Sequence, residues 1–296
     1  MSKPRLLIIG ANGFLGQHLA AQAAPCYEVW RADISPPSGE RTLALDVTSA
    51  ASVNDVFERS DPNVTVLLAA ISDIDQCEKS PELARAVNVT GASNVVEECA
   101  RTGAKLVFTS SAAVFDGTRH GYQESDPPTP VSVYGTTKAL AEEMISWKLP
   151  SALIIRLALV IGFAQGSTNA MLNRFAAKLQ AGESVLLPDF EYRNPIDAYT
   201  LSCFVLELLS ADGGAGIFHV GGSDPISRFE LGVRLADQLN LPLDLVRRQT
   251  EPQPGRAPRG LDHFLLTGKL QSVCRTPVPT SDEIIERAIH GSPQSN

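Results

Sequence analysis

Cysteine, positive charge and long apolar runs are all scarce in this chain of 296 residues. The five cysteines are odd in number, widely spaced and form no C-x-x-C pair: Cys26, Cys77, Cys99, Cys203 and Cys274. A disulfide framework or a zinc site normally needs a paired or clustered set. The cysteines therefore argue against both, predict no bound metal, and fit a reducing compartment.

Basic residues are outnumbered, because 25 Lys and Arg stand against 33 Asp and Glu, a net charge of −8. Proteins that bind nucleic acid normally carry a basic surplus, so this balance argues against a nucleic-acid partner. It remains compatible with one anionic ligand in a local basic pocket. The most apolar start, residues 6–9, is too short for a signal peptide or a membrane span. These features predict a cytoplasmic protein with no membrane partner.

The order of apolar segments predicts an α/β protein. The apolar fraction of 44% and charged fraction of 20% are typical of globular domains, and the length suggests about two of them. Up to Gly162, short β-rich runs alternate with helical stretches, which indicates a doubly wound parallel sheet of the Rossmann type. After Gly162 helical patterns dominate. We expect a first domain over 1–162, to which later segments return, a smaller and mainly helical lobe over 163–290, and a flexible tail over 291–296.

A glycine-rich turn joins the first predicted strand to the first predicted helix. It reads Gly10-Ala11-Asn12-Gly13-Phe14-Leu15-Gly16, with G-x-x-G-x-x-G spacing. Glycine permits a sharp turn and a close backbone approach, and the N-terminus of the helix offers N–H groups to a pyrophosphate. Ordinary turns also favour glycine, but the position between strand and helix favours a dinucleotide site. The first domain is therefore expected to bind a dinucleotide, and the lobe to bind the substrate.

Two acidic positions follow the next strands. Asp33 ends the second strand, where a carboxylate can accept hydrogen bonds from the adenosine ribose and repel the 2′-phosphate of NADP. It favours NAD, whereas Arg31 leaves NADP open. Asp46 and Val47 follow the third strand and suit the adenine edge, but Asp46 also suits the start of a helix.

A Tyr-x-x-x-Lys pair at the start of a helix is the strongest catalytic signal. The spacing places Tyr134 and Lys138 on one helix face, where the ammonium would lower the pKa of the phenol. The phenol could then exchange a proton with a substrate oxygen near neutral pH. Ser110 and Ser111 end the fifth strand, where a serine can hydrogen-bond the same oxygen. Each signal also has an ordinary structural explanation, but the ordered set seldom arises by chance.

These motifs resemble the extended short-chain dehydrogenase/reductase superfamily, also described as NAD-dependent epimerases/dehydratases. The resemblance covers nearly the whole chain, and its carriers are GANGFLG (10–16), LLAAIS (67–72), NVTGASNV (88–95), FTSSAAVFDG (108–117), VYGTTKALAEE (133–143) and IIRLALVIG (154–162). Within the superfamily, the segments at 69–88, 114–130 and 257–270 are most similar to the dTDP-4-dehydrorhamnose reductase branch.

The resemblance implies a role for each matching residue. It implies that Ser111 polarises the substrate oxygen, that Tyr134 is the acid/base, and that Lys138 tunes Tyr134 and binds the nicotinamide ribose. The residues that it places at the cofactor are Gly10, Asn12, Gly13, Phe14, Leu15, Gly16, Asp33, Asp46, Val47, Ala69, Ala70, Asn88, Tyr134 and Lys138. The implied activity is NAD- or NADP-dependent reduction of a keto group, with a nucleotide sugar as the small-molecule substrate.

Two departures from the family patterns narrow this activity. Ala112 and Ala113 stand where 4,6-dehydratases carry an Asp-Glu pair, which disfavours dehydration. The segment Arg156-Leu157-Ala158-Leu159 has no Trp where rhamnose-pathway reductases usually have one, which puts that sugar in doubt. Two other functions stay open: an NAD-dependent nucleotide-sugar 4-epimerase, and a non-catalytic dinucleotide-binding regulatory subunit.

Arginines after residue 162 are the candidates for substrate binding. Arg193, Arg256 and Arg259 could form bidentate contacts with a nucleotide diphosphate. Solvated loop arginines would look the same in the sequence. His219 is expected to be an interior histidine rather than a catalyst. No interface can be read from the sequence, so a homodimer also stays open.

Overall fold

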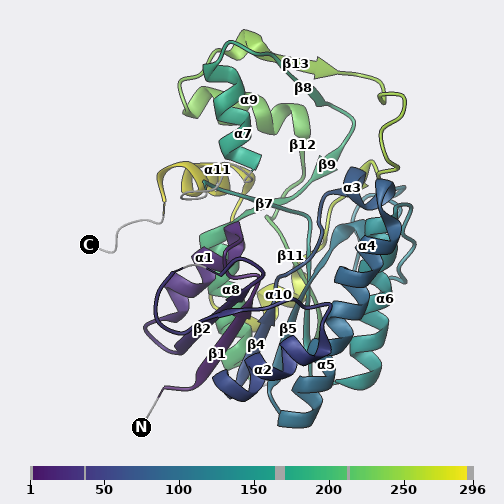
Figure 1. Cartoon of the computed structure of the whole chain (residues 1–296). Helices are drawn as coiled ribbons and strands as arrows, with labels where there is room; N and C mark the ends of the chain where they lie inside the picture. Colours follow the sequence, from purple (N-terminus) through teal and green to yellow (C-terminus); the bar gives the residue numbers. More distant parts are fainter. Residues whose placement is uncertain (1–2, 37, 164–170, 212–213, 292–296) are drawn as a thin grey trace.

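A computed structural model describes residues 3–36, 38–163, 171–211 and 214–291 of the chain. Figure 1 shows a lower α/β body and, above it, a smaller lobe that carries α7, α9, β8 and β13. The predicted doubly wound parallel sheet is confirmed: seven strands pair in parallel in the order β11-β6-β5-β4-β1-β2-β3. Their bounds are β1 (Arg5–Ile9), β2 (Glu28–Asp33), β3 (Thr42–Ala44), β4 (Val64–Leu67), β5 (Lys105–Ser111), β6 (Leu153–Leu157) and β11 (Gly216–Val220).

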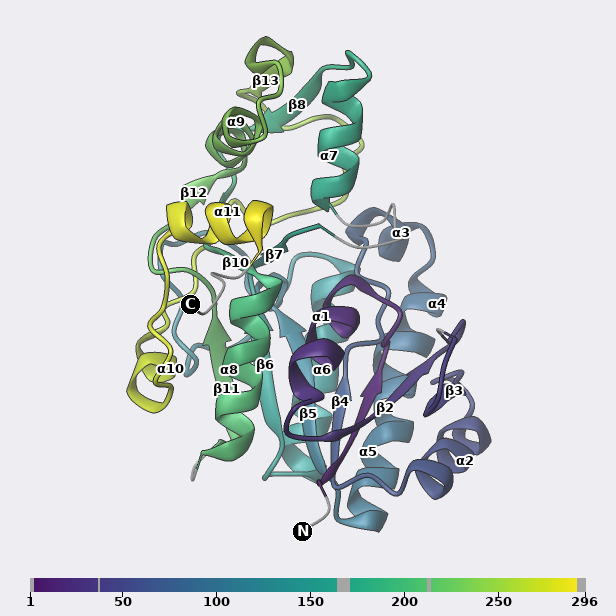
Figure 2. The ribbon, with the colours of Figure 1, turned by 90° about the vertical axis from the view of Figure 1, so that its left-hand side faces the viewer.

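Strand β1 explains why the sheet is covered on both faces. Its side chains alternate between the faces, and all four of its apolar side chains are buried. Leu6 and Ile8 pack with residues of α1 and α8, while Leu7 and Ile9 pack with residues of α2 and α5. Figure 2 shows α1 and α8 on the viewer's side of the sheet, with α5 and α6 behind it. These helices are α1 (Phe14–Ala23), α2 (Ala50–Ser60), α5 (Gly91–Thr102), α6 (Val133–Lys148) and α8 (Ala198–Ser210).

The helix that the sequence predicts over residues 81–101 contains an irregular turn. It consists of α4 (Pro81–Arg85), a π-helical turn η1 (Ala86–Thr90) and α5. A short helix, α3 (Ile74–Lys79), precedes it. The π-turn carries Asn88, whose side chain is buried. Single π-turns inside helices are frequent at functional sites, and this turn lies under the predicted cofactor region.

The later part of the chain contains more strands than the sequence predicts. The sequence predicts helices over residues 171–180, 228–239 and 282–290, and the structure has them as α7 (Met171–Gln180), α9 (Arg228–Gln238) and α11 (Ser281–His290). The strands were missed because they are only two to four residues long, too short to show a period. They are β7 (Leu159–Ile161), β8 (Val185–Pro188), β9 (Tyr192–Arg193), β10 (Pro195–Asp197), β12 (Ile226–Ser227), β13 (Val246–Gln249) and β14 (Asp262–His263).

Three short elements complete the described chain: η2 (Ala112–Val114), η3 (Leu243–Leu245) and α10 (Gly268–Val273). Strand β11 comes from the second half of the sequence but forms the edge of the central sheet next to β6. A later segment therefore returns to the first domain. Of the tail expected over 291–296, residues 292–296 lie outside the described ranges. In those ranges, no helix combines the length and apolarity that crossing a membrane requires.

Candidate active site

A cavity of about 540 Å³ lies between the carboxyl ends of the central strands and the smaller lobe. Its sheet side contains Ala70 after β4, Ser110 and Ser111 at the end of β5, and Tyr134 and Lys138 on α6. Its lobe side contains an acidic residue and several basic ones: Arg174, Glu191, Arg193, Arg228, Arg256 and Arg259. The structure therefore brings the predicted catalytic residues and the predicted substrate arginines to opposite walls of one cleft.

The glycine loop runs past the end of β4, where only glycine fits. Gly10 has a φ of +89°, and a Cβ there would lie 2.7 Å from the Ala69 nitrogen. A Cβ on Gly16 would lie 2.5 Å from the Gly10 oxygen. Helix α1 begins directly after Gly13, and within the described chain no side chain caps its N-terminus. The first-turn N–H groups are thus available to an anion, as a dinucleotide diphosphate requires.

Asp33 lies at the end of β2, directly beside this loop. Its Oδ2 accepts a hydrogen bond from the Asn12 nitrogen at 3.0 Å, and its Oδ1 accepts one from the Ser35 nitrogen at 3.3 Å. The carboxylate is therefore held at the edge of the glycine loop, where an adenosine ribose would arrive.

The other predicted cofactor residues belong to turns that surround the same edge of the sheet. Asp46 accepts hydrogen bonds from the nitrogen and hydroxyl of Thr48, which lower the pKa of its carboxyl. The Val47 oxygen accepts one from the Asn94 side chain at 2.8 Å. Both positions are thus fixed by local contacts. Whether they touch adenine stays a prediction.

Asn88 connects the cofactor side of the cleft to the catalytic helix. Its side chain accepts a hydrogen bond from the Ile71 nitrogen at 2.8 Å and donates to the Ile71 oxygen and the Thr137 hydroxyl, both at 3.0 Å. Ile71 follows Ala69 and Ala70, and Thr137 lies between Tyr134 and Lys138. Asn88 therefore sets the distance between the loop after β4 and the start of α6.

Tyr134 and Lys138 lie at the carboxyl end of β5, on the first turns of α6. The Lys138 ammonium donates to the Thr109 oxygen at 2.8 Å and lies 4.6 Å from the centre of the Phe108 ring. The Ser111 hydroxyl accepts from the Ala113 nitrogen at 3.1 Å, and it also hydrogen-bonds the Tyr134 phenol. These contacts bring the three predicted catalytic side chains together.

The pKa of Tyr134 differs from the expectation in this state of the protein. Burial raises it to about 12, and the Ser111 hydrogen bond offsets only part of that rise. Burial also lowers the pKa of Lys138 to about 8. Lys138 is not among the groups that shift the pKa of the phenol, and its ammonium is directed to the Thr109 carbonyl. A further positive charge in the cleft would favour the phenolate.

Ser110 is buried in the same cavity and has no partner for its hydroxyl in the described chain. The neighbouring Ser111 does have partners. A buried hydroxyl without a hydrogen bond costs about 1–3 kcal/mol, so such groups are usually satisfied by a ligand or water. Ser110 thus marks a polar position at the floor of the cleft.

The arginines predicted to bind substrate hold the lobe wall together. Arg193 donates to the oxygens of Tyr192, Leu261 and Gly260, at 2.6, 3.0 and 3.0 Å. Arg259 forms a bidentate pair with Asp75 of α3, at 3.2 and 2.6 Å. Their role toward a substrate stays a prediction.

Arg256 has a partner of its own. Its Nη1 lies 2.5 Å from an oxygen of Glu191, a carboxylate that is buried in the wall. The segment around Arg256 and Arg259 therefore lines the cleft and is held both by Glu191 of the lobe wall and by Asp75 of α3.

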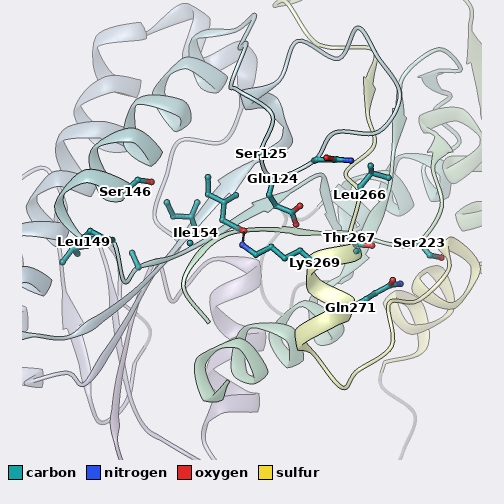
Figure 3. A pocket seen from close by; sticks show the side chains of 16 residues that line it. Glu124, Ser125, Ser146, Leu149, Ile154, Ser223, Leu266, Thr267, Lys269 and Gln271 are labelled. Carbon is teal, nitrogen blue, oxygen red and sulfur yellow. Dashed lines mark hydrogen bonds between the residues drawn. The ribbon is translucent and has the colours of Figure 1, made fainter. Parts of the chain in front are cut away.

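A second cavity, of about 1010 Å³, lies away from these residues, beside the edge strand β11 (Figure 3). Its charged groups serve the strand itself. Lys269 donates to the Ile217 oxygen at 2.6 Å, and Glu124 accepts from the His219 nitrogen at 3.1 Å. Charged side chains of this kind protect an exposed strand edge from pairing with other chains. The cavity between the sheet and the lobe remains the candidate active site.

Comparison with known families agrees with this geometry. The model of the family described as "RmlD substrate binding domain" matches residues 4–292. The chain belongs to this family. The sequence-based resemblance to dTDP-4-dehydrorhamnose reductases is thereby confirmed.

Some relatives of this RmlD family member are named as reductases, and others as a subunit of a different enzyme. The dTDP-4-dehydrorhamnose reductase of Mycobacterium tuberculosis is 30% identical, over 86% of this chain and 82% of the relative. The methionine adenosyltransferase 2 subunit beta of Xenopus tropicalis is 28% identical, over 91% of this chain and 82% of the relative. A crystal structure of the Bacillus anthracis dTDP-4-dehydrorhamnose reductase in complex with NADP has a TM-score of 0.87 and 26% identity, covering 97% of this chain and 98% of the other.

Three residues of this site cannot be selected from the sequence alone. Asp75 and Glu191 hold Arg259 and Arg256, and Arg228 lies in the lobe wall at the start of α9. Asp75 and Glu191 are among 33 acidic residues, and Arg228 follows a predicted helix start. One signal in the sequence was that residues 256–259 contain two arginines and no lysine. In this RmlD family member both arginines form ion pairs with residues far away in the sequence.

Proposed function

We propose that the chain is an NAD(P)H-dependent reductase that acts on a keto group of a nucleotide sugar. The observation that carries this proposal is the single cleft that joins a free helix N-terminus, a Ser–Tyr–Lys set and a wall of arginines. Residues 1–162, together with β11, would bind the dinucleotide, and residues 163–290 would bind the substrate. The names of the reductase relatives support the same activity.

The cofactor fits the residues that are present. The loop from Gly10 to Gly16 would hold its diphosphate, and Asp33 would accept hydrogen bonds from the adenosine ribose. Asp33 favours NAD, whereas the Bacillus anthracis relative was crystallised with NADP, so both forms belong in any assay. When bound, the reduced nicotinamide supplies the hydride that reaches the carbonyl carbon.

The chain's own residues would supply the proton. Tyr134 donates its phenolic proton to the carbonyl oxygen as negative charge develops there. Ser111 donates a hydrogen bond to the same oxygen and keeps it near Tyr134. Lys138, held by the Thr109 oxygen, would supply positive charge to the catalytic set and would bind the nicotinamide ribose. Ala112 and Ala113 provide no acid/base pair for a dehydration.

The substrate's phosphates would lie against the lobe wall. Arg193, Arg256 and Arg259 place positive charge opposite Tyr134, across the same cavity. An anionic carrier group bound there would leave the sugar between the arginines and the catalytic set. The wall therefore supports a nucleotide sugar over an uncharged sugar.

The direct test is the stoichiometry of the reaction. The protein is incubated with dTDP-4-keto-6-deoxysugars and their UDP counterparts, with NADH and NADPH in separate reactions. A reductase oxidises a molecule of coenzyme for each molecule of product. The epimerase alternative needs nucleotide sugars that carry a hydroxyl at C4, incubated in parallel: interconversion of their C4 epimers without net coenzyme oxidation would instead indicate the 4-epimerase.

The second candidate is a dinucleotide-binding regulatory subunit. It is favoured by the relatives named methionine adenosyltransferase 2 subunit beta, which match over 91% of this chain. This function predicts dinucleotide binding without turnover of any keto-sugar nucleotide, together with a stable complex with a different enzyme. Turnover that is lost in Tyr134→Phe would exclude it.

A further inference from the structure

The arginines of the lobe wall differ in how much of their hydrogen-bonding capacity is already used. A guanidinium has five N–H donors. Arg193 donates three hydrogen bonds to backbone oxygens. Arg259 forms a bidentate pair with Asp75, and Arg256 forms a hydrogen-bonded ion pair with Glu191. These pairings explain how the wall is built, but they leave the three side chains poorly placed to receive a new ligand without rearrangement.

Arg228 is different. Its guanidinium lines the cleft, and no residue in the described ranges forms a hydrogen bond or an ion pair with it. Its backbone is nevertheless fixed. The Arg228 nitrogen donates to the Glu191 oxygen at 3.0 Å, and the preceding Ser227 caps α9 through the Glu230 nitrogen, also at 3.0 Å. A rigid main chain thus presents an unpaired cation to the cavity.

The surroundings of Arg228 are electrostatically unfavourable without an anion. Burial lowers the pKa of its guanidinium, and the nearby positive charges of Arg256 and Arg259 lower it further. Among the described residues, Glu191 is the nearby group that raises this pKa, and its carboxylate is already bonded to Arg256. Grouped like charges of this kind are stabilised when an anion enters among them.

We propose that Arg228 is the principal phosphate-binding residue of the cleft, and that Arg193 and Arg259 are positioning residues that hold the wall around it. This assignment rests on the proposed function, because it takes the carrier phosphate of the substrate as its ligand. The sequence selects other arginines for the phosphate contact. The proposal assigns the main phosphate contact to Arg228 instead. The planar guanidinium matches a phosphate in a bidentate geometry that lysine cannot reproduce.

The test measures equilibrium binding of three probes: thymidine diphosphate, uridine diphosphate and inorganic diphosphate. Each is titrated into wild type, Arg228→Gln and Arg228→Lys. Arg247→Gln is the matched control, because it removes the same charge from an exposed position on β13 of the same lobe. Melting temperatures confirm that each variant is folded.

We expect Arg228→Gln to weaken binding of the probes by about 10- to 100-fold, the range for one lost charge-assisted contact. Arg228→Lys should restore part of that loss, and Arg247→Gln should bind like wild type. In turnover assays Arg228→Gln should raise KM far more than it lowers kcat.

The assignment is overturned if Arg228→Gln binds the probes as wild type does, or if wild type binds none of them. It is also overturned if Arg247→Gln and Arg228→Gln lose the same affinity, since that would be a general charge effect. Failure of the proposed function looks different. In that case wild type binds the probes through Arg228 but reduces no keto-sugar nucleotide.

Discussion

The two walls of the cleft are built in different ways. On the sheet wall, functional groups stand at strand ends and successive helix turns, so neighbours in sequence are neighbours in space. On the lobe wall, two arginines are held by distant partners: Arg256 by Glu191, 65 residues away, and Arg259 by Asp75, 184 residues away. Local spacing thus determines the sheet wall, whereas long-range ion pairs determine the lobe wall.

The largest effect is expected on the sheet wall, from Tyr134→Phe. Removing the phenolic proton donor should lower kcat by about 10²- to 10⁴-fold, the usual contribution of a positioned acid. Dinucleotide affinity should change little, because the glycine loop is untouched. Tyr199→Phe, at a partly exposed position on α8, controls for the loss of a hydroxyl. Undiminished turnover in Tyr134→Phe would contradict the catalytic assignment.

Acid should lower the free energy of unfolding through two buried histidines, one near each wall of the cleft. Burial lowers the pKa of His219 on the sheet and of His263 on the lobe from 6.5 to about 3. The unfolded chain therefore binds more protons between these values. Stability is fully present above pH 6.5 and falls on acidification toward about pH 3, by at most about 1.4 kcal/mol per pH unit for each histidine.

Urea unfolding at a series of pH values measures this loss. His263→Gln keeps a donor for the Phe115 oxygen, which lies 3.1 Å from Nε2, and should flatten the acid side of the profile. His290→Gln, at an exposed position in the last turn of α11, should leave it unchanged. An unaltered profile in both His263→Gln and His219→Gln would show that acid acts through other groups.

The ion pair between Asp75 and Arg259 of the lobe wall should couple more strongly than an ordinary surface ion pair. In a double-mutant cycle, Asp75→Asn and Arg259→Gln should show a coupling of about 1 kcal/mol in the free energy of unfolding. The pair is bidentate, and only 15% of the Arg259 side chain is exposed. The exposed pair Asp55 and Arg59 is the control, with about 0.3–0.5 kcal/mol. Equal coupling in the two cycles would mean that Asp75 does not hold the wall.

An effect of similar size concerns coenzyme choice. Asp33→Asn removes the charge that would repel a 2′-phosphate and keeps an acceptor for the Asn12 nitrogen. We expect the affinity for NADPH to rise about tenfold relative to NADH, or about 1.4 kcal/mol. Asp244→Asn, at an exposed position in η3, controls for the change in net charge. If the ratio of the two affinities stays constant, Asp33 does not select the coenzyme.

The difference between the walls also explains what the sequence could predict. The order of strands and helices, the glycine loop and the Tyr134–Lys138 pair all follow from spacings of a few residues. The pKa of Tyr134 did not follow, because burial is a property of the assembled fold. The role of Arg228 did not follow either. An arginine becomes a binding residue only when its neighbours are already paired, and those pairs are not visible in a single sequence.

The most direct test of the proposed activity uses coenzyme that carries deuterium at the transferable position of nicotinamide C4. Wild-type protein is incubated with dTDP-4-keto-6-deoxysugars and labelled NADH or NADPH, and the product is analysed by NMR. The account predicts one deuterium in each product molecule, on the carbon that carried the keto group, and an equal amount of oxidised coenzyme. Product without deuterium or coenzyme oxidation, or no product despite tight dinucleotide binding, would contradict it.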